Sequence, residues 1–177
     1  GFIYPIKKLN FTGRKSIIIG SGGAARSAVQ GLTDLKLSEV IVISRNESNL
    51  KNFLNDFKNY KSVKGCLANN TNTGDLINQA DLIINTTPIG MKNFNLDYDD
   101  LPFGEAFWSS LNPKSTVYDL VYNPKFTKLL RFAEKKGCQI LDGSEMLVAQ
   151  GAKSLSYWTG ISDIPIELMK QSINKFL

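Results

Sequence analysis

A glycine-rich turn near the start of the chain has the residue types needed to seat a pyrophosphate. Residues 16–28 read Ser-Ile-Ile-Ile-Gly-Ser-Gly-Gly-Ala-Ala-Arg-Ser-Ala, an apolar strand that runs through a turn into a helix. Gly20 suits the tight turn, Gly22 lets the backbone approach phosphates, and Ala25 allows the helix to pack closely on the strand. N–H groups and the positive end of the helix dipole, beginning near Gly23, would face the anion. Small residues also occur at ordinary strand-to-helix turns, so the other loops must decide between the two interpretations.

A second group of residues follows the next expected strand and suits a phosphate. Ser44, Arg45 and Asn46 stand just past residues 40–43, where an NAD-selective site usually carries an acid. A 2′-phosphate is bound instead by a cation and by hydroxyl or amide donors, which these side chains supply. They therefore predict a preference for NADP(H). Glu47 places an acid beside the cation, and a solvated Arg45 at a helix N-terminus is the alternative.

Three further loops belong at the same edge, because ligands of an open α/β sheet collect beyond the carboxyl ends of its strands. Residues 85–91, Asn-Thr-Thr-Pro-Ile-Gly-Met, form a turn that can wall a nicotinamide ring or be an ordinary turn. Tyr122 brings a phenol to the crevice, either for a substrate or for packing. Gly143, Met146 and Gln150 share one stripe of an expected helix, and a glutamine on such a stripe indicates a ligand more than a core.

The elements that must position these loops alternate between strands and helices. Short β-branched runs predict strands that are covered on both faces, and apolar residues three and four apart predict helices. This alternation predicts an α/β fold: a Rossmann-like, doubly wound, mostly parallel sheet with helices on both faces. Asn46 is expected to cap one helix and Gly137 to end another. We expect strands over 16–19, 40–43, 82–84, 116–120 and 139–141, helices over 24–35, 47–57, 127–136, 144–158 and 168–173, and surface loops over 68–73 and 94–100.

Composition narrows the function classes. The 177 residues carry 21 Lys and Arg against 16 Asp and Glu, but the lysines are scattered, which does not favour a nucleic-acid surface. The chain has no histidine, which excludes serine–histidine hydrolysis and histidine-bound zinc, and its two cysteines lack metal-ligand spacing, so we expect no metal. No apolar run approaches the roughly 20 residues of a membrane span, and we expect a cytoplasmic protein.

Taken together, these segments resemble the carboxyl-terminal, cofactor-binding half of shikimate dehydrogenases. They occur in the family's order and cover nearly the whole chain. Ser44 and Asn46 replace the family's Asn and Thr, and Asn49 stands where the family has a second basic residue, for which Lys51 is the nearest substitute. The matching segments are 20–25 (Gly-Ser-Gly-Gly-Ala-Ala), 44–46 (Ser-Arg-Asn), 85–91, 119–124 (Asp-Leu-Val-Tyr-Asn-Pro) and 142–151 (Asp-Gly-Ser-Glu-Met-Leu-Val-Ala-Gln-Gly).

The resemblance implies roles for individual residues. Those implied to bind NADP(H) are Gly20, Ser21, Gly22, Gly23, Ala24, Ser44, Arg45, Asn46, Asn85, Thr86, Thr87, Pro88, Leu120, Gly143 and Met146. Those implied to touch the substrate are Tyr122 and Gln150. The family's acid–base Lys and its partner Asp belong to an upstream domain, so the resemblance implies no catalytic residue in this chain.

The implied activity is that of an NADP-dependent shikimate dehydrogenase, which transfers a hydride reversibly between NADPH and 3-dehydroshikimate. The chain begins at Gly1 as if inside a longer protein, and alone it is expected to bind the cofactor without turnover. We expect one domain over 1–177, with 160–177 packing back on it or toward an amino-terminal substrate domain of the same parent; a second copy is a further candidate partner. The alternatives are an NAD-linked quinate/shikimate dehydrogenase and a non-catalytic dinucleotide-sensing module.

Overall fold

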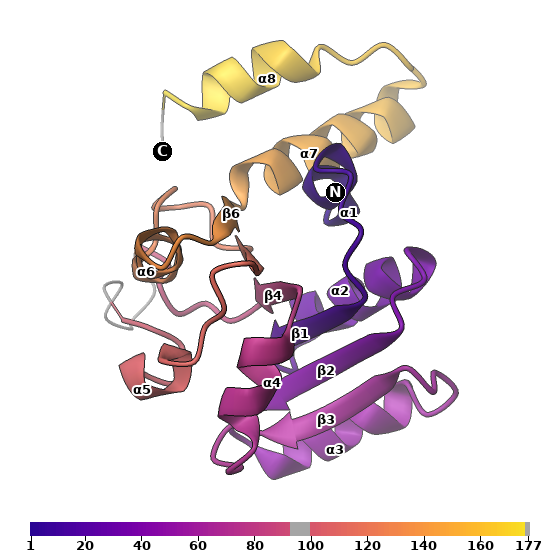
Figure 1. The fold of residues 1–177 in the computed structure, drawn as a ribbon. Helices are drawn as coiled ribbons and strands as arrows, with labels where there is room; N and C mark the ends of the chain where they lie inside the picture. Colours follow the sequence, from indigo (N-terminus) through magenta and orange to yellow (C-terminus); the bar gives the residue numbers. More distant parts are fainter. Residues whose placement is uncertain (93–99, 176–177) are drawn as a thin grey trace.

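Six parallel strands form the centre of the molecule. The computed structural model describes residues 1–92 and 100–175, and its strands lie in the order β3-β2-β1-β4-β5-β6 (Figure 1). This is the strand order of doubly wound dinucleotide-binding sheets, and it confirms the predicted fold class. The strands are β1 (Lys15–Ile19), β2 (Glu39–Ser44), β3 (Val63–Leu67), β4 (Leu82–Asn85), β5 (Thr116–Asp119) and β6 (Gln139–Leu141).

The register brings the carboxyl ends of the central strands level with one another. Ile19 at the end of β1 pairs with Ile43 of β2 on one side and with Asn85 of β4 on the other. Asn85 in turn pairs with Asp119, the last residue of β5. The loops that leave these four strands therefore meet at a single edge of the sheet.

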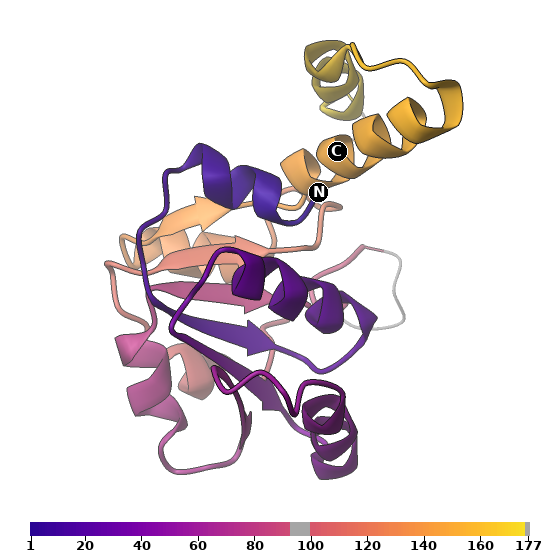
Figure 2. The same ribbon diagram turned by 90° about the vertical axis from the view of Figure 1, so that its right-hand side faces the viewer.

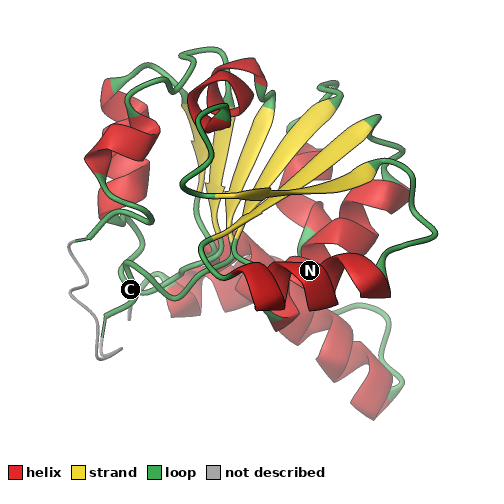
Figure 3. Ribbon diagram, turned by 90° about the horizontal axis from the view of Figure 1, so that it is seen from below, coloured by secondary structure: helices red, strands yellow, loops and turns green. Residues whose placement is uncertain are grey.

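Helices cover both faces of this sheet (Figure 3). Alternate strand residues point to opposite faces, so Ile18 packs with α2 and α3 in one core and Ile17 with α4 and α6 in the other. The helices are α1 (Ile3–Lys8), α2 (Gly23–Asp34), α3 (Glu47–Asp56), α4 (Thr73–Gln79), α5 (Glu105–Trp108), α6 (Lys128–Lys135), α7 (Ser144–Thr159) and α8 (Ile166–Ile173).

The last two helices form a hairpin that projects from the body of the fold (Figure 2). The terminal helix α8 lies against α7 and away from the sheet, and it has no buried residue. Leu168 in α8 and Trp158 near the end of α7 are 60% and 82% exposed. The spacing of apolar residues in α8 therefore predicts an apolar face but does not say which surface covers that face.

Most predicted elements are confirmed within one or two residues. Asn46 caps α3 by accepting a hydrogen bond from the Asn49 N–H over 2.9 Å, and Gly137 follows the end of α6 with a φ of 88°. The motifs missed β3, α1, α4 and α5. The predicted loop at 68–73 is confirmed up to Thr73, which opens α4, whereas 94–100 lies outside the described residues except for Asp100. Within residues 1–92 and 100–175, no helix is both long and apolar enough to cross a membrane.

Candidate functional site

The glycine turn is closed on its strand side and open on its helix side. Gly20 has a φ of +103°, and a Cβ there would stand 2.9 Å from the Thr86 Oγ1, so only glycine fits. Gly22 is the N-cap of α2, and a Cβ at Gly22 or Gly23 would meet no atom within 4 Å. Ala25 is completely buried against the sheet. The backbone at the start of α2 is therefore accessible to a ligand.

Arg26 holds the turn from behind. Its guanidinium donates to the carbonyl oxygens of Ser21 and Gly22 over 3.2 and 3.3 Å and forms an ion pair with Asp56 at 2.7 Å. The first turn of α2 contains no acidic side chain, so nothing there opposes an anion at the positive end of the helix dipole. The motifs pointed to neither Arg26 nor Asp56.

The end of β2 is joined to the glycine turn by hydroxyl groups. The Oγ atoms of Ser21 and Ser44 lie 3.1 Å apart, and the Ser44 hydroxyl also donates to the Asn46 carbonyl oxygen over 3.3 Å. Ser44 is only 5% exposed, so its hydroxyl serves contacts within the chain. Arg45 and Asn46 are exposed, and Asn46 uses its Oδ1 to cap α3. The surface at the end of β2 thus presents a guanidinium and an amide NH₂.

A cavity of about 290 Å³ opens beside this turn, between α2, α7 and the loops after β4 and β5. It brings together seven of the predicted site residues and three others, Ser27, Met91 and Val121. Tyr122 does not line it, and its side chain is 36% exposed just beyond Val121. The predicted residues that line it are Ala24, Thr86, Thr87, Pro88, Leu120, Met146 and Gln150.

Two walls of this cavity are fastened by a buried polar network. Asp119 is fully buried, and its carboxylate accepts hydrogen bonds from the Asn85 Nδ2 at 2.9 Å, the Thr127 hydroxyl at 2.6 Å and the Val121 N–H at 3.1 Å. The Asn85 Oδ1 accepts from the backbone N–H and the hydroxyl of Thr87, over 3.0 and 2.7 Å. Burial raises the pKa of Asp119 to about 7, although the three hydrogen bonds act to lower it. The family resemblance did not single out this carboxylate.

The helix α7 forms the third wall, and close backbone contact sets its position. Gly143, its N-cap, lies directly against the Leu120 carbonyl. The carbonyl occupies the space that a Cβ at residue 143 would need. Met146 and Gln150 follow on the same stripe and face the cavity, as their spacing predicts.

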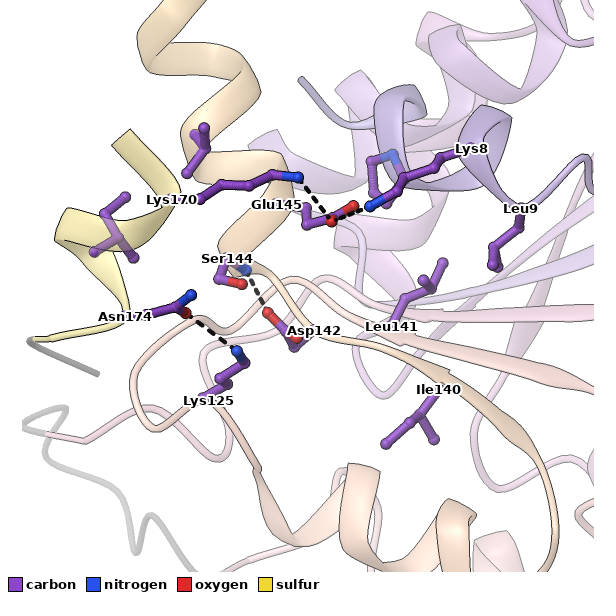
Figure 4. Close-up of a pocket in the computed structure, with 13 residues that line it drawn as sticks. Lys8, Leu9, Lys125, Ile140, Leu141, Asp142, Ser144, Glu145, Lys170 and Asn174 are labelled. Atoms are coloured by element: carbon purple, nitrogen blue, oxygen red, sulfur yellow. Dashed lines mark hydrogen bonds and ion pairs between the residues drawn. The ribbon is translucent and has the colours of Figure 1, made fainter. Parts of the chain in front are cut away.

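The opposite side of α7 borders a separate cavity of about 360 Å³ (Figure 4). There the Glu145 carboxylate lies between the Lys8 and Lys170 ammonium groups, at 2.6 and 3.2 Å, and so joins α1, α7 and α8. Burial alone would raise the pKa of Glu145, but the hydrogen bonds and charges of the two lysines lower it below its usual value. None of the predicted site residues lines this cavity, whose charged groups instead anchor α7.

The open glycine turn and the cavity lie at the same edge of the sheet, where the carboxyl ends of the strands meet. Together with the strand order, this is the arrangement of the dinucleotide-binding class of α/β domains. The chain belongs to the shikimate / quinate 5-dehydrogenase family, whose model matches residues 5–94. A model of the shikimate 5′-dehydrogenase C-terminal domain matches residues 143–173.

Individual relatives support this assignment. A curated shikimate dehydrogenase (NADP(+)) of Prochlorococcus marinus is 51% identical over all 177 residues, which span 62% of its length. The crystal structure of shikimate 5-dehydrogenase from Listeria monocytogenes with shikimate and NAD is 28% identical, with a TM-score of 0.82 over 97% of this chain and 60% of that one. A shikimate dehydrogenase solved with NADP+ is 32% identical, with a TM-score of 0.73 over 94% of this chain and 55% of that one. The chain thus spans about three fifths of the length of these relatives.

Proposed function

We propose that this chain is the NADP(H)-binding part of a shikimate dehydrogenase, which interconverts 3-dehydroshikimate and shikimate with NADPH as hydride donor. The observation that carries the proposal is the open backbone at Gly22 and Gly23, which shares one edge of the sheet with the cavity containing Gln150. A pyrophosphate fits there because its oxygens can reach the N–H groups of α2 without meeting a side chain. Membership in the family favours a dehydrogenase function for this site.

The candidate cofactor residues fall into three groups along this edge. The phosphates would bind at Gly20, Ser21, Gly22, Gly23 and Ala24, and the 2′-phosphate at Arg45 and Asn46, with Ser44 holding their loop against Ser21. The nicotinamide end would enter the 290 Å³ cavity, whose walls are formed or supported by Asn85, Thr86, Thr87, Pro88, Leu120, Gly143 and Met146. The bound cofactor supplies the hydride, and the chain holds it in place.

Tyr122 and Gln150 are the candidate substrate contacts. Gln150 lines the cavity and can donate and accept hydrogen bonds through its amide. Tyr122 directly follows Val121, which lines the cavity, and its side chain is exposed. Reduction of a ketone also needs an acid that protonates the forming alkoxide. The relatives are longer than this chain, and we assign the acid to the part of their length that these 177 residues do not match. Residues 1–177 would then act as one cofactor-binding unit.

The preference for NADP(H) over NAD(H) rests on the end of β2. The exposed side chains at residues 45 and 46 are a cation and an amide, and the exposed acid Glu47 follows them at the start of α3. The position that commonly holds an acid in NAD sites is the buried Ser44. An acidic side chain there would repel a 2′-phosphate, whereas Arg45 attracts one.

Calorimetric titration of the chain with NADPH and with NADH tests the proposal. We expect NADPH to bind at least about tenfold more tightly, the effect of one charge-assisted phosphate contact. Equal affinities would contradict the cofactor preference and favour the NAD-linked alternative. If neither dinucleotide binds, the proposed function is wrong. Shikimate and NADP+ together should produce no NADPH with the chain alone, and turnover would contradict the assignment of the acid elsewhere.

A further inference from the structure

One buried carboxylate holds both the β4 loop and the β5 loop that border the cavity. Asp119 is the last residue of β5, and its two oxygens receive hydrogen bonds from three different segments. The donors are the side chain that ends β4, the backbone of its own loop, and the N-cap of α6. Asn85, Asp119 and Thr127 are each at most 1% exposed, so water does not compete for these bonds.

One branch of the network reaches the β4 loop. The Asn85 Nδ2 donates to Asp119, which leaves its Oδ1 free to accept both the N–H and the hydroxyl of Thr87. The Thr87 hydroxyl in turn accepts from the Ile89 N–H over 3.3 Å. Thr87 and the following Pro88 line the cavity, so the orientation of the Asn85 amide determines the position of this wall.

The other branch reaches the β5 loop and α6. The Val121 N–H donates to the same Asp119 oxygen that accepts from Asn85, while Leu120 and Val121 line the facing wall. The second oxygen accepts from Thr127, whose hydroxyl also caps α6 by accepting from the Leu130 N–H. Loss of the carboxylate would release both walls, because they share one acceptor.

We propose that Asp119 is a positioning residue that sets the separation of the β4 and β5 loops for the nicotinamide end of the cofactor. This inference rests on the proposed function, and it adds a residue that would act without touching the cofactor: neither Asp119 nor Thr127 lines the cavity. It therefore distinguishes the two ends of the dinucleotide. The phosphate and adenosine contacts at Gly22 and Arg45 lie outside the network and should not depend on it.

The test compares NADPH with adenosine 2′,5′-bisphosphate, which has the 2′-phosphate but no nicotinamide. For Asp119→Ala and Thr127→Val we expect NADPH affinity to fall about tenfold, the size of losing hydrogen bonds to a buried charged group, while the bisphosphate changes less than about twofold. Thr127→Ser keeps the hydroxyl and should restore wild-type NADPH affinity. Ser115→Ala is a control, since it removes a hydroxyl of equal burial at the other end of β5.

Circular dichroism identifies which variants are folded. If Asp119→Ala does not fold, Thr127→Val decides, because valine has nearly the same shape as threonine. Folded variants that bind NADPH as the wild type does, or that lose NADPH and the bisphosphate equally, would overturn the positioning role. If the wild-type chain binds neither ligand, the proposed function is wrong. If the wild type binds both ligands, the proposed function holds and the variants alone test the positioning role of Asp119.

Discussion

The N-terminus of α7 lies in direct backbone contact with Leu120. Residue 143 is a glycine with a φ of −74°, an angle open to any residue, and the Cβ that another residue would carry meets the carbonyl carbon of Leu120 at 2.8 Å and the Val121 carbonyl oxygen at 2.9 Å. The requirement for glycine is therefore steric and not conformational. The same contact fixes where Met146 and Gln150 enter the cavity.

Gly143→Ala should destabilise the fold and displace α7. Backbone atoms cannot rotate away from the new methyl group, so we expect a loss of about 1 to 3 kcal/mol in the free energy of unfolding, the usual cost of overpacking. Urea unfolding measures it. Gly151→Ala is the matched control in the same helix, where the nearest atom is the end of the flexible Met169 side chain, and it should be neutral or stabilising by up to about 1 kcal/mol. Equal losses from both substitutions would contradict the steric explanation.

Substitution of two glycines in the phosphate turn should affect different properties: stability at Gly20 and ligand affinity at Gly22. Gly20→Ala forces a side chain into a φ of +103° and against Thr86, so we expect it to cost about 2 kcal/mol or more of stability. Gly22→Ser keeps a favoured N-cap residue in open space and should leave stability nearly unchanged. Its side chain nevertheless occupies the approach to the backbone, and affinity for NADPH and for adenosine 2′,5′-bisphosphate should fall at least about tenfold. A stable Gly22→Ser chain with wild-type affinity would argue against a phosphate site at this turn.

The sequence was sufficient for the central strands but not for the edges of the fold. β1 and β2 are runs of β-branched residues that are buried on both faces, which is the pattern that predicts parallel strands. β3 is an edge strand with exposed Lys64 and Gly65, so its pattern is weak. α1 depends on tertiary contacts that no local pattern encodes. One is the stacking of Phe2, its N-cap residue, on Tyr118, with 5.7 Å between the ring centroids.

The candidate site divides in the same way. Residues that a ligand would touch follow strand ends at recognisable spacing, and the structure brings Ala24, Thr87 and Gln150 to one cavity. Asp119 and Arg26 act behind the site through partners 34 and 30 residues away in the sequence. Only the folded register brings such partners together, so a motif alone does not reveal them.

Arg45→Ala tests the end of β2 as the site of the 2′-phosphate. We expect affinity for NADPH and for adenosine 2′,5′-bisphosphate to fall about tenfold or more, because a guanidinium–phosphate contact is a charge-assisted bond, while NADH affinity stays the same. Arg14→Ala removes another exposed arginine, which precedes β1 at the opposite edge of the sheet, and it controls for net charge. If the two variants lose NADPH affinity alike, the effect is one of overall charge and Arg45 has no specific role.

The buried carboxylate of Asp119 should make stability depend on pH in a direction opposite to that of an ordinary surface acid. Burial raises its pKa from 3.8 to about 7, so between these values the folded chain holds a proton that the unfolded chain has lost. Its contribution to the free energy of unfolding therefore falls as pH rises through this window, by about 1.4 kcal/mol per pH unit, and is constant above it.

Asp119→Asn removes this titration while keeping an acceptor for Val121 and Asn85. Urea unfolding near pH 5 and near pH 8 should show the wild type losing stability relative to the variant as pH rises, because only the wild type must bury a charge at the higher pH. Ser115→Ala, which alters no titratable group, is the control and should show no such relative change. A wild-type-to-variant difference that is constant across the window would mean that Asp119 is already ionised at pH 5, and that its three donors outweigh the cost of burial.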